Sequence, residues 1–406
     1  QLYMVVESMQ ADPQVDLLYS NEDKIDESSR RMEPTFKAAW SPEYFLSFMY
    51  IGHLAVYRRT LIEKAGRFRP GYEGSQDYDL ALRVTEITDR VRHIPQILYH
   101  WRKHMDSVAL NLHAKPYAFK AAKKALKDAM QRRGLRAQVK DTGVLGVYNT
   151  SVVLDSAPAV QVLVYGHRGD NIDPTLLELK SRTHYVRVDY IVGVCGSGAC
   201  PELTAFLRQN LSAVTADFVL LYHSRLLPRN ADWLEHLVQF GIRPGIGATG
   251  AKILAPDLSC LHAGYTLMEG KLAHNGYGCS VDDTGYAARL VATHNTSVVS
   301  SLCMLIRRQN LLEMLATHPD YQSQAAFETA LCLELRCRDM RVVWTPHAQL
   351  VLNGSRFDKY QDLRDFPKDW RELEQRFAIS RFTDPYYPIG LDRTCLLYTS
   401  PSPRDS

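Results

Sequence analysis

Three side chains able to bind cations follow a short apolar run near the start of the sequence. The run "VDLLYS", residues 15–20, is typical of a buried strand, and Asn21, Glu22 and Asp23 come directly after it. Open α/β folds bind their ligands at the carboxyl ends of strands. Mg²⁺ prefers oxygen ligands and takes one or two carboxylates together with substrate phosphates. These residues are therefore candidates for a divalent-cation site, although most acidic loops after strands are only solvated.

A second group of carboxylates lies in "EGSQDYDLALR", residues 73–83. Asp77 and Asp79 stand at the start of an expected helix, directly after Gln76. The helix macrodipole favours negative charge at that end, so a structural cap explains both acids. A carboxylate held there also suits the task of a general base.

A third polar group closes a later strand, "HIPQILYHWR", residues 93–102. It ends in His100, Trp101 and Arg102. Histidine can ligate a metal and arginine can hold a phosphate. Each of the three motifs alone is more often structural than functional, but all three in this order on one sheet favour a site.

The elements that must position these residues alternate between strands and helices. Apolar runs at 160–167, 190–195 and 218–222 indicate buried parallel strands, and the periodicity of 201–211 and 230–240 indicates helices. This alternation is typical of an α/β fold with a doubly wound sheet.

The sequence also predicts an internal repeat. Residues 52–102 and 300–352 share one order of apolar run, arginine pair, helix, loop, helix and strand, with Arg58-Arg59 and Arg307-Arg308 at the same place. We expect two copies of one domain, the first lacking its front part.

The second copy differs from the first in its polar residues. The run "FVLLYHSRLLP", residues 218–228, resembles residues 17–23, with His223, Ser224 and Arg225 in place of the acids. Glu328 and Ala330 stand where an acidic pair is expected. We therefore interpret the second copy as a degenerate, non-catalytic domain.

Four separate stretches together carry a family resemblance. They are "YSNEDKID", "FKAAWSPEYFLS", "GSQDYDLALRV" and "HIPQILYHWR", residues 19–26, 36–47, 74–84 and 93–102. In this order and spacing they resemble bacterial family-two glycosyltransferases of the tandem-domain kind, which build O-antigen and related surface polysaccharides and include rhamnosyltransferase-like members. The resemblance covers nearly all of residues 1–110 and continues more weakly through 158–390.

The resemblance implies a fold, a reaction and ligands. The fold would be GT-A, a Rossmann-like mixed sheet flanked by helices. The reaction would move a sugar from a nucleotide-sugar donor to a glycan or lipid-linked saccharide acceptor, with Mg²⁺ or Mn²⁺ at the donor diphosphate. The alternative is a non-catalytic carbohydrate-binding or scaffolding protein derived from such an enzyme.

The same resemblance implies roles for single residues. Asp77 would be the catalytic base, and Asp23 and His100 would ligate the metal. Asn21, Glu22 and Arg102 would contact the donor, with Asn21 replacing the family's usual aspartate. The supporting residues would be Gln76, Asp79 and Trp101.

The expected boundaries divide the chain into four parts. Residues 1–111 would be the later half of a catalytic domain, 112–157 a basic helical linker, 158–394 the degenerate second domain, and 395–406 a disordered tail. That tail, with its clustered Pro and Ser, resembles translated sequencing-adapter DNA, and the chain opens on Gln1 within an expected helix. We expect a gene fragment that is inactive without its front half.

Composition limits the class of protein. Hydrophobic residues make up 46% and charged residues 23%, as in a soluble globular protein. A net charge of +3 is too small to indicate nucleic-acid binding. The eight cysteines form no CxxC pair, which favours a reducing, cytoplasmic compartment over a disulfide framework or zinc site.

The basic linker raises the question of whether the protein docks on a membrane surface. Residues 115–140 hold nine Lys or Arg and one acid, Asp128, on a predicted helix. A solvated face is the preferred interpretation, because the apolar side is mostly Ala. Peripheral docking on an anionic inner-membrane surface is the alternative.

Overall fold

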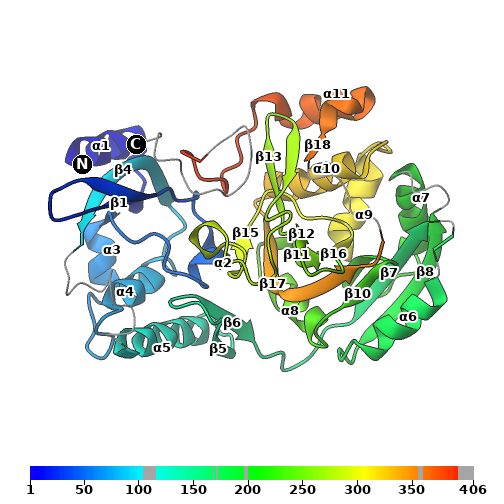
Figure 1. Cartoon of the computed structure of the whole chain (residues 1–406), viewed down its shortest axis with the longest axis horizontal. Coiled ribbons are helices and arrows are strands. Elements are labelled where there is room, and N and C mark those ends of the chain that lie inside the picture. Colours follow the sequence, from blue (N-terminus) through cyan, green and yellow to red (C-terminus); the bar gives the residue numbers. More distant parts are fainter. Residues whose placement is uncertain (104–115, 168, 171, 196–199, 355–359, 392–406) are drawn as a thin grey trace.

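The computed structural model describes residues 1–103, 116–167, 169–170, 172–195, 200–354 and 360–391. Within these ranges the chain forms two α/β units, one built from the blue-to-teal part of the chain and one from the green-to-orange part (Figure 1). The tail predicted at 395–406 lies outside the described residues.

The first unit contains a four-stranded mixed sheet. Its strands are β1 (Leu17–Ile25), β2 (Arg31–Thr35), β3 (Ala55–Tyr57) and β4 (Val91–Arg102). Strand β1 pairs antiparallel with β2 and β3 and parallel with β4. The same unit contains four helices, α1 (Leu2–Ala11), α2 (Pro42–Phe45), α3 (Arg59–Lys64) and α4 (Gln76–Val84).

The second unit is built on a nine-stranded mixed sheet, whose main path runs β10-β17-β11-β16-β9-β7-β8. These strands are β7 (Val160–His167), β8 (Val188–Cys195), β9 (Phe218–His223), β10 (Leu226–Pro228), β11 (Ile246–Leu254), β16 (Cys303–Arg307) and β17 (Arg341–Leu352). Strands β12 (Cys260–His262) and β15 (His294–Asn295) pair with β11 and β17.

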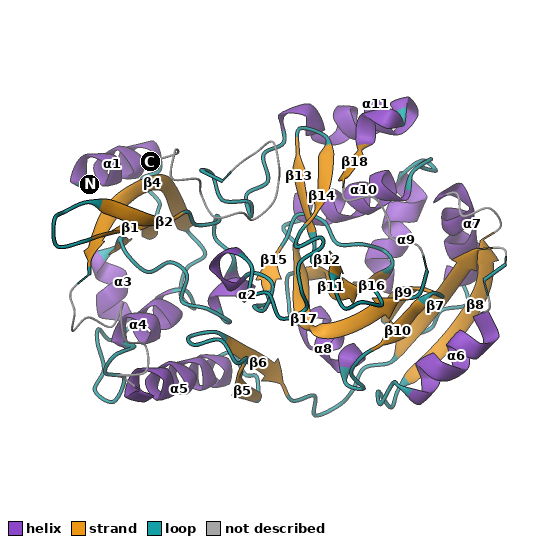
Figure 2. Cartoon of the chain, in the orientation of Figure 1, coloured by secondary structure: helices purple, strands orange, loops and turns teal. Residues whose placement is uncertain are grey.

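Helices cover both faces of this sheet. Apolar side chains of α6 (Ile172–Ser181) and α8 (Trp233–Gly241) share one buried cluster with the sheet. Those of α7 (Cys200–Leu211), α9 (Arg308–Thr317) and α10 (Gln324–Cys337) share another. Figure 2 shows the strands lying between these helices. The predicted fold class, α/β with a mixed sheet flanked by helices, is confirmed.

Smaller elements complete the second unit. Strands β13 (Tyr265–Met268), β14 (Lys271–His274) and β18 (Tyr360–Asp362) form a three-stranded sheet. Helix α11 (Pro367–Phe377) lies close to α10, and short 3₁₀ turns occur at η2 (Tyr286–Ala288), η3 (Leu363–Asp365) and η4 (Ile379–Arg381).

The pairing of strands supports the internal repeat but corrects its alignment. Strand β1 has an antiparallel hairpin partner, an antiparallel neighbour and a parallel neighbour in β2, β3 and β4. Strand β11 has the same three partners in β12, β16 and β17. Strand β9 instead pairs parallel with β7 and antiparallel with β16. The topological counterpart of β1 is therefore β11.

This alignment overturns one interpretation of the sequence. The sequence predicts that the runs at 17–23 and 218–225 are equivalent, with His223, Ser224 and Arg225 in place of the acids. In the structure Asp23 pairs with His100 in register, and its counterpart by strand pairing is Leu254 beside Val351. Within the described part of the first unit, no strand pairs with the other edge of β3, where β9 lies beside β16 in the second unit.

The basic helix is an integral part of the first unit. Helix α5 (Pro116–Arg132) buries Ala122, Ala125, Leu126 and Met130 in one apolar cluster with residues of β1, α2 and α4. The hairpin β5 (Ala137–Asp141) and β6 (Tyr148–Val152) follows, and Tyr148 N donates to Ser47 O at 2.8 Å. Several lysines of α5 are exposed, as expected for a solvated face, but the segment does more than link two domains.

The two units contact each other along several segments. Ser41 Oγ donates to Asn295 Oδ1 at 2.8 Å, and Val152 N donates to Gln239 Oε1 at 2.7 Å. The last described segment returns to the first unit, where Ala39 N donates to Pro385 O at 2.8 Å. Beside this bond, Phe36 of the first unit packs against an apolar cluster that contains Tyr387 and Leu391.

No described helix combines the length and apolar character that crossing a bilayer requires.

The packing of α5 gives a stability prediction. Leu126→Ala removes a fully buried side chain and should lower the free energy of unfolding by about 2–5 kcal/mol. The neighbouring exposed Lys127→Ala should change it by less than about 0.5 kcal/mol. Urea unfolding followed by circular dichroism measures both, and equal stability of the two variants would contradict the assignment of α5 to the core.

Candidate functional site

The acids at the end of β1 are held by internal partners. Asp23 is 2% exposed, and its carboxylate accepts hydrogen bonds from Arg31 Nε at 2.6 Å and from His100 Nδ1. Glu22 accepts from His53 N at 2.9 Å and lies 3.5 Å from Lys37 Nζ. Both carboxylates therefore face a cation of the chain itself.

Lys37 and His93 complete this buried cluster. Burial lowers the pKa of Lys37 to about 8, against the opposing effect of Glu22, and its Nζ donates to Ile51 O and His53 O at 2.7 Å each. Burial also lowers the pKa of His93 to about 3, so the ring is neutral near pH 7. Its Nε2 donates to Asn21 Oδ1 at 2.9 Å, and Lys37 N donates to the same oxygen at 2.8 Å.

The end of β4 meets the predictions in part. The parallel register places His100 opposite Asp23, as a shared site requires. Trp101 packs edge-on against the ring of His53, with centroids 5.5 Å apart. Arg102 donates to Asp26 O at 2.9 Å and to Ser29 Oγ at 3.2 Å, so its guanidinium binds the turn between β1 and β2.

The start of α4 holds the predicted base. Asp77 is half-buried and lines a cavity of about 220 Å³ together with Met49, Tyr78, Phe119 and Tyr148. Gln76 is exposed, and its Oε1 accepts from Gly74 N at 2.7 Å. No hydrogen bond or ion pair of the described residues joins Asp77 to Asp23 or His100.

Asp79 has a structural task on the same helix. It is fully buried and accepts hydrogen bonds from Arg83 Nε and Nη2 at 3.0 and 2.7 Å, and from Arg69 Nε at 3.1 Å. Burial alone raises the pKa of Asp79, but the bonds from Arg69 and Arg83 outweigh it and hold this pKa below its ordinary value. The supporting role predicted for Asp79 fits this ion-pair network.

The residues predicted to ligate a metal do not fit an Mg²⁺ or Mn²⁺ ion in this arrangement. Such an ion needs several oxygen ligands, and usually keeps waters besides one or two carboxylates. The carboxylate of Asp23 already binds the Arg31 cation, and His100 donates a hydrogen bond to the same carboxylate. Among the described residues no three His, Cys, Asp or Glu side chains cluster closely enough to hold a metal.

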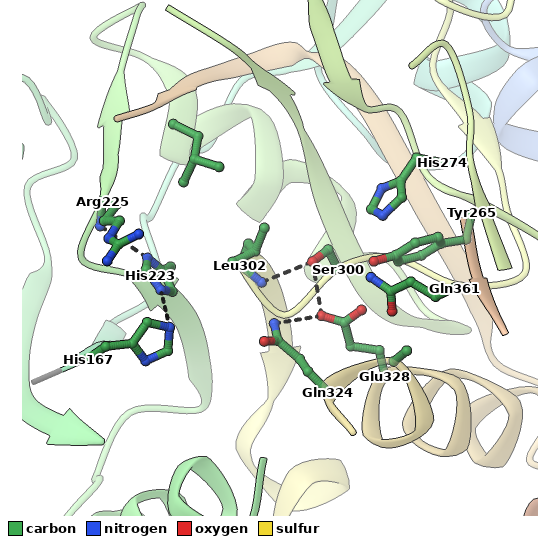
Figure 3. A pocket seen from close by; sticks show the side chains of 12 residues that line it. His167, His223, Arg225, Tyr265, His274, Ser300, Leu302, Gln324, Glu328 and Gln361 are labelled. Atoms are coloured by element: carbon green, nitrogen blue, oxygen red, sulfur yellow. Dashed lines mark hydrogen bonds between the residues drawn. The ribbon is translucent and has the colours of Figure 1, made fainter. Parts of the chain in front are cut away.

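A pocket in the second unit was not predicted. It encloses about 200 Å³ where strands β7 and β9 end, the edge at which open α/β sheets bind ligands. Figure 3 shows His167 and His223 on one side of it and Glu328 with Ser300 and Tyr265 on the other. The pocket is smaller than the roughly 300–1,000 Å³ of sites for drug-sized ligands, so it has room for only one small chemical group of a ligand.

Glu328 is the acidic residue at the centre of this pocket. It is 1% exposed, and its Oε1 accepts from Ser300 Oγ at 2.9 Å, Ser301 N at 2.7 Å, Ser301 Oγ at 2.8 Å and Gln324 Nε2 at 3.0 Å. Burial raises the pKa of Glu328 above its ordinary value, although these hydrogen bonds act in the opposite direction.

The opposite wall carries two histidines and an ion pair. His223 Nε2 lies 3.3 Å from His167 Nε2, and burial, with His167 nearby, lowers the pKa of His223 to about 4. Arg225 Nε donates to Asp170 Oδ1 at 2.9 Å. The pocket thus places the neutral imidazole of His223 and the ring of His167 opposite a buried carboxyl group, an arrangement able to hydrogen-bond the hydroxyls of a polar ligand.

Two signals in the sequence could have indicated this pocket. His167 ends the predicted strand 160–167 and Asp170 follows it, and Ser323-Gln324 repeats the Ser75-Gln76 pair that opens α4. Counted back from the paired strands, Glu328 lies 14 residues before Val342 of β17, as Asp77 lies 14 residues before Val91 of β4. The sequence indicates His223, Arg225 and Glu328 only as replacements of acids, and it gives no role to His167, Tyr265, Ser300 and Gln324.

Comparison with known proteins gives relatives along nearly the whole chain, although no family model matches. An uncharacterised protein of Sinorhizobium fredii is 29% identical over 98% of this chain and 48% of its own length. The O-antigen biosynthesis protein RfbC of Myxococcus xanthus is 28% identical over 95% of this chain and 32% of its own length. The chain therefore spans half or less of these relatives.

Solved structures resemble the chain in part. A mannosyltransferase from Pyrobaculum calidifontis in complex with GDP-Man and Mn²⁺ is 13% identical, with a TM-score of 0.33 over 50% of this chain and 59% of that one. GalNAc-T7 with UDP, GalNAc and Mn²⁺ is 10% identical, with a TM-score of 0.39 over 63% of this chain and 56% of that one.

The geometry predicts that Asp23 contributes to stability. Asp23→Asn keeps the shape but removes the charge that Arg31 faces, and should lower the free energy of unfolding by about 1–3 kcal/mol. Glu27→Gln, an exposed change in the same hairpin, is the control. Calorimetric titration with Mn²⁺ should give the same heat of binding for the original chain and for Asp23→Asn. Loss of Mn²⁺ binding in Asp23→Asn alone would instead restore the metal assignment.

The raised pKa of Glu328 predicts how stability changes with pH. A carboxyl group whose folded pKa lies above the unfolded value of about 4.3 favours folding when protonated, and that benefit is lost as the pH rises through the folded pKa. Glu328→Gln should therefore be as stable as the original chain or more stable at pH 7, with the difference shrinking towards pH 4. Thermal melts across pH 4–8 measure this, and a variant destabilised chiefly at pH 7 would contradict it.

Proposed function

We propose that this chain is part of a glycosyltransferase that moves a sugar from a nucleotide-sugar donor to a growing surface polysaccharide. The observation that carries the proposal is the 28% identity to an O-antigen biosynthesis protein over 95% of the chain. Because the chain spans 32% of that relative, the activity is proposed for the protein of which this sequence forms part.

The site geometry supports a role for Asp77. In the proposed reaction an acceptor hydroxyl oxygen attacks the anomeric carbon, the bond to the diphosphate oxygen breaks, and Asp77 takes the hydroxyl proton. Its side chain is half-buried in the lining of a cavity that also contains aromatic rings, which suits a sugar acceptor. The buried pair of Asp79 and Arg83 fixes the helix that carries it.

The proposal includes a nucleotide-sugar donor and a divalent metal, but it assigns no reaction step to either of them. Asn21, Glu22 and Arg102 were predicted to contact the donor, but each is bonded within the chain. A divalent cation stays part of the proposed cofactor set, although Asp23 and His100 do not fit it here. A hexosyl or rhamnosyl donor, a lipid-linked acceptor and a cytoplasmic, membrane-peripheral location complete the proposal.

One observation favours the alternative of a non-catalytic carbohydrate-binding protein. The carboxylates of Glu22, Asp23 and Asp79 all lie in ion pairs within the chain. The pocket around Glu328 would then bind a saccharide without transferring it.

A donor screen distinguishes the two functions. The purified longer protein of which this chain forms part is incubated with a panel of nucleotide sugars and glycan acceptors, and release of nucleoside diphosphate is measured. Asp77→Asn should lower the rate about 10²–10⁴-fold while donor binding stays unchanged, because only the proton acceptor is lost. The exposed Glu73→Gln on the same loop should turn over normally.

Two results would argue against the proposal. Parental turnover by Asp77→Asn would remove Asp77 from the reaction. Glycan binding without release of nucleoside diphosphate from any donor would favour the non-catalytic alternative.

A further inference from the structure

A large cleft lies where the two units meet. It encloses about 870 Å³ and is lined by α2 and the ends of α4 and α5 on one side, and by the residues after α8 and at the start of β17 on the other. Trp40, Phe45 and Met130 give it an apolar wall. None of the residues proposed for sugar transfer lines this cleft.

Three arginines from different elements line the same cleft. Arg133 follows α5, Arg243 follows α8 and Arg341 opens β17. The charge of Glu43 acts favourably on Arg243 and the charges of Arg133 and Arg341 act unfavourably on it, so these groups lie within electrostatic range of one another. A cleft that gathers guanidinium groups in this way favours an anion.

Arg243 is buried without a carboxylate partner at hydrogen-bond distance. It is 8% exposed, its Nε donates to Gln239 O at 3.1 Å, and its guanidinium lies 4.4 Å from the ring centroid of Phe240. Its Nη2 has no hydrogen-bond partner among the described residues. Burial lowers the pKa of Arg243 to about 10, which reflects the cost of enclosing this charge.

Arg133 on the facing unit is partly exposed and only loosely paired. Its Nη2 lies 3.9 Å from Glu86, whose carboxylate is already bound by Arg132 at 2.6 and 2.9 Å. The Nη1 of Arg133 is buried, and no described residue accepts from it.

The other acids of the cleft are bound by other partners or exposed. Glu43 accepts from Asn295 Nδ2 at 2.6 Å and pairs with Arg341 at 3.2 Å. Asp89 is exposed, and the fourth arginine of the lining, Arg90, pairs with Asp16 at 2.7 Å. The Arg243 guanidinium is thus buried with no carboxylate at hydrogen-bond distance among the described residues, and the partly exposed Arg133 has Glu86 only at 3.9 Å. Enclosing the Arg243 charge in this way is costly unless a ligand supplies an anionic group.

We propose that the cleft between the units is a binding site for an oxyanion, a phosphate or a carboxylate, whose ligand also carries an apolar part. Arg133 and Arg243 bind the oxyanion, because a planar guanidinium matches the geometry of both groups. Trp40, Phe45 and Met130 contact the apolar part. The site is independent of the proposed sugar transfer and joins both units through one ligand.

The test uses small probes and the 406-residue chain. Phenyl phosphate, benzoate, inorganic phosphate and phenol are titrated calorimetrically, since they separate the oxyanion from the ring. Phenyl phosphate or benzoate should bind more tightly than both inorganic phosphate and phenol. The tighter of the two identifies a phosphate or a carboxylate as the natural group.

Two variants test the arginines separately. Arg243→Gln and Arg133→Gln should each weaken binding of the better probe roughly tenfold, because each removes a charge-assisted hydrogen bond. The exposed Arg371→Gln on α11, outside the cleft lining, is the matched control and should bind normally. Thermal melts check that each variant is folded. If Arg243→Gln does not fold, the test depends on Arg133→Gln alone.

Three outcomes would overturn the proposal. They are the absence of binding by every anionic probe, equal binding of phenol and phenyl phosphate, and unchanged affinity in a folded arginine variant.

Discussion

The buried carboxylate of Glu43 ties the two units together. It lies on α2 of the first unit at 3% exposure, and its partners, Asn295 on β15 and Arg341 on β17, belong to the second. Leaving such a charge unpaired costs several kcal/mol, so separating the units at this point is strongly opposed. The Ser41–Asn295 bond adds a neutral contact beside it. Because Glu43 is satisfied from across the junction, the relative placement of α2, α8 and β17 is fixed, and with it the walls of the cleft.

Apolar patterning allowed the architecture to be predicted. Runs such as "VQVLVYGH" became β7, buried along most of its length, because a strand covered by helices on both faces has no polar side to show. The repeat was visible in the arginine pairs, since each pair begins a helix directly after a short antiparallel strand, β3 or β16. The opposition of Asp23 and His100 followed from both residues lying at the ends of strands that proved to be parallel neighbours.

What the sequence did not reveal depends on contacts between distant residues. Strands β1 and β9 have similar apolar runs ending in Tyr, and only their partners, β4 in one case and β7 in the other, distinguish them. The acids after β1 suggested a metal site, but Arg31 and His100, which lie 8 and 77 residues from Asp23, hydrogen-bond its carboxylate in the fold. Glu328 was recognised as an acid out of place, whereas the serines that bind it precede it by 27 and 28 residues.

The return of residues 385–391 to the first unit has a consequence for synthesis on the ribosome. Ala39 receives its partner Pro385, and Phe36 its neighbours Tyr387 and Leu391, only after more than 340 further residues have been translated. At about 5–20 residues per second this interval lasts roughly 20–70 s. During that time the Phe36 side chain of the nascent first unit lacks the apolar cover that Tyr387 and Leu391 later supply. These contacts of the first unit form only when residues 385–391 have left the exit tunnel.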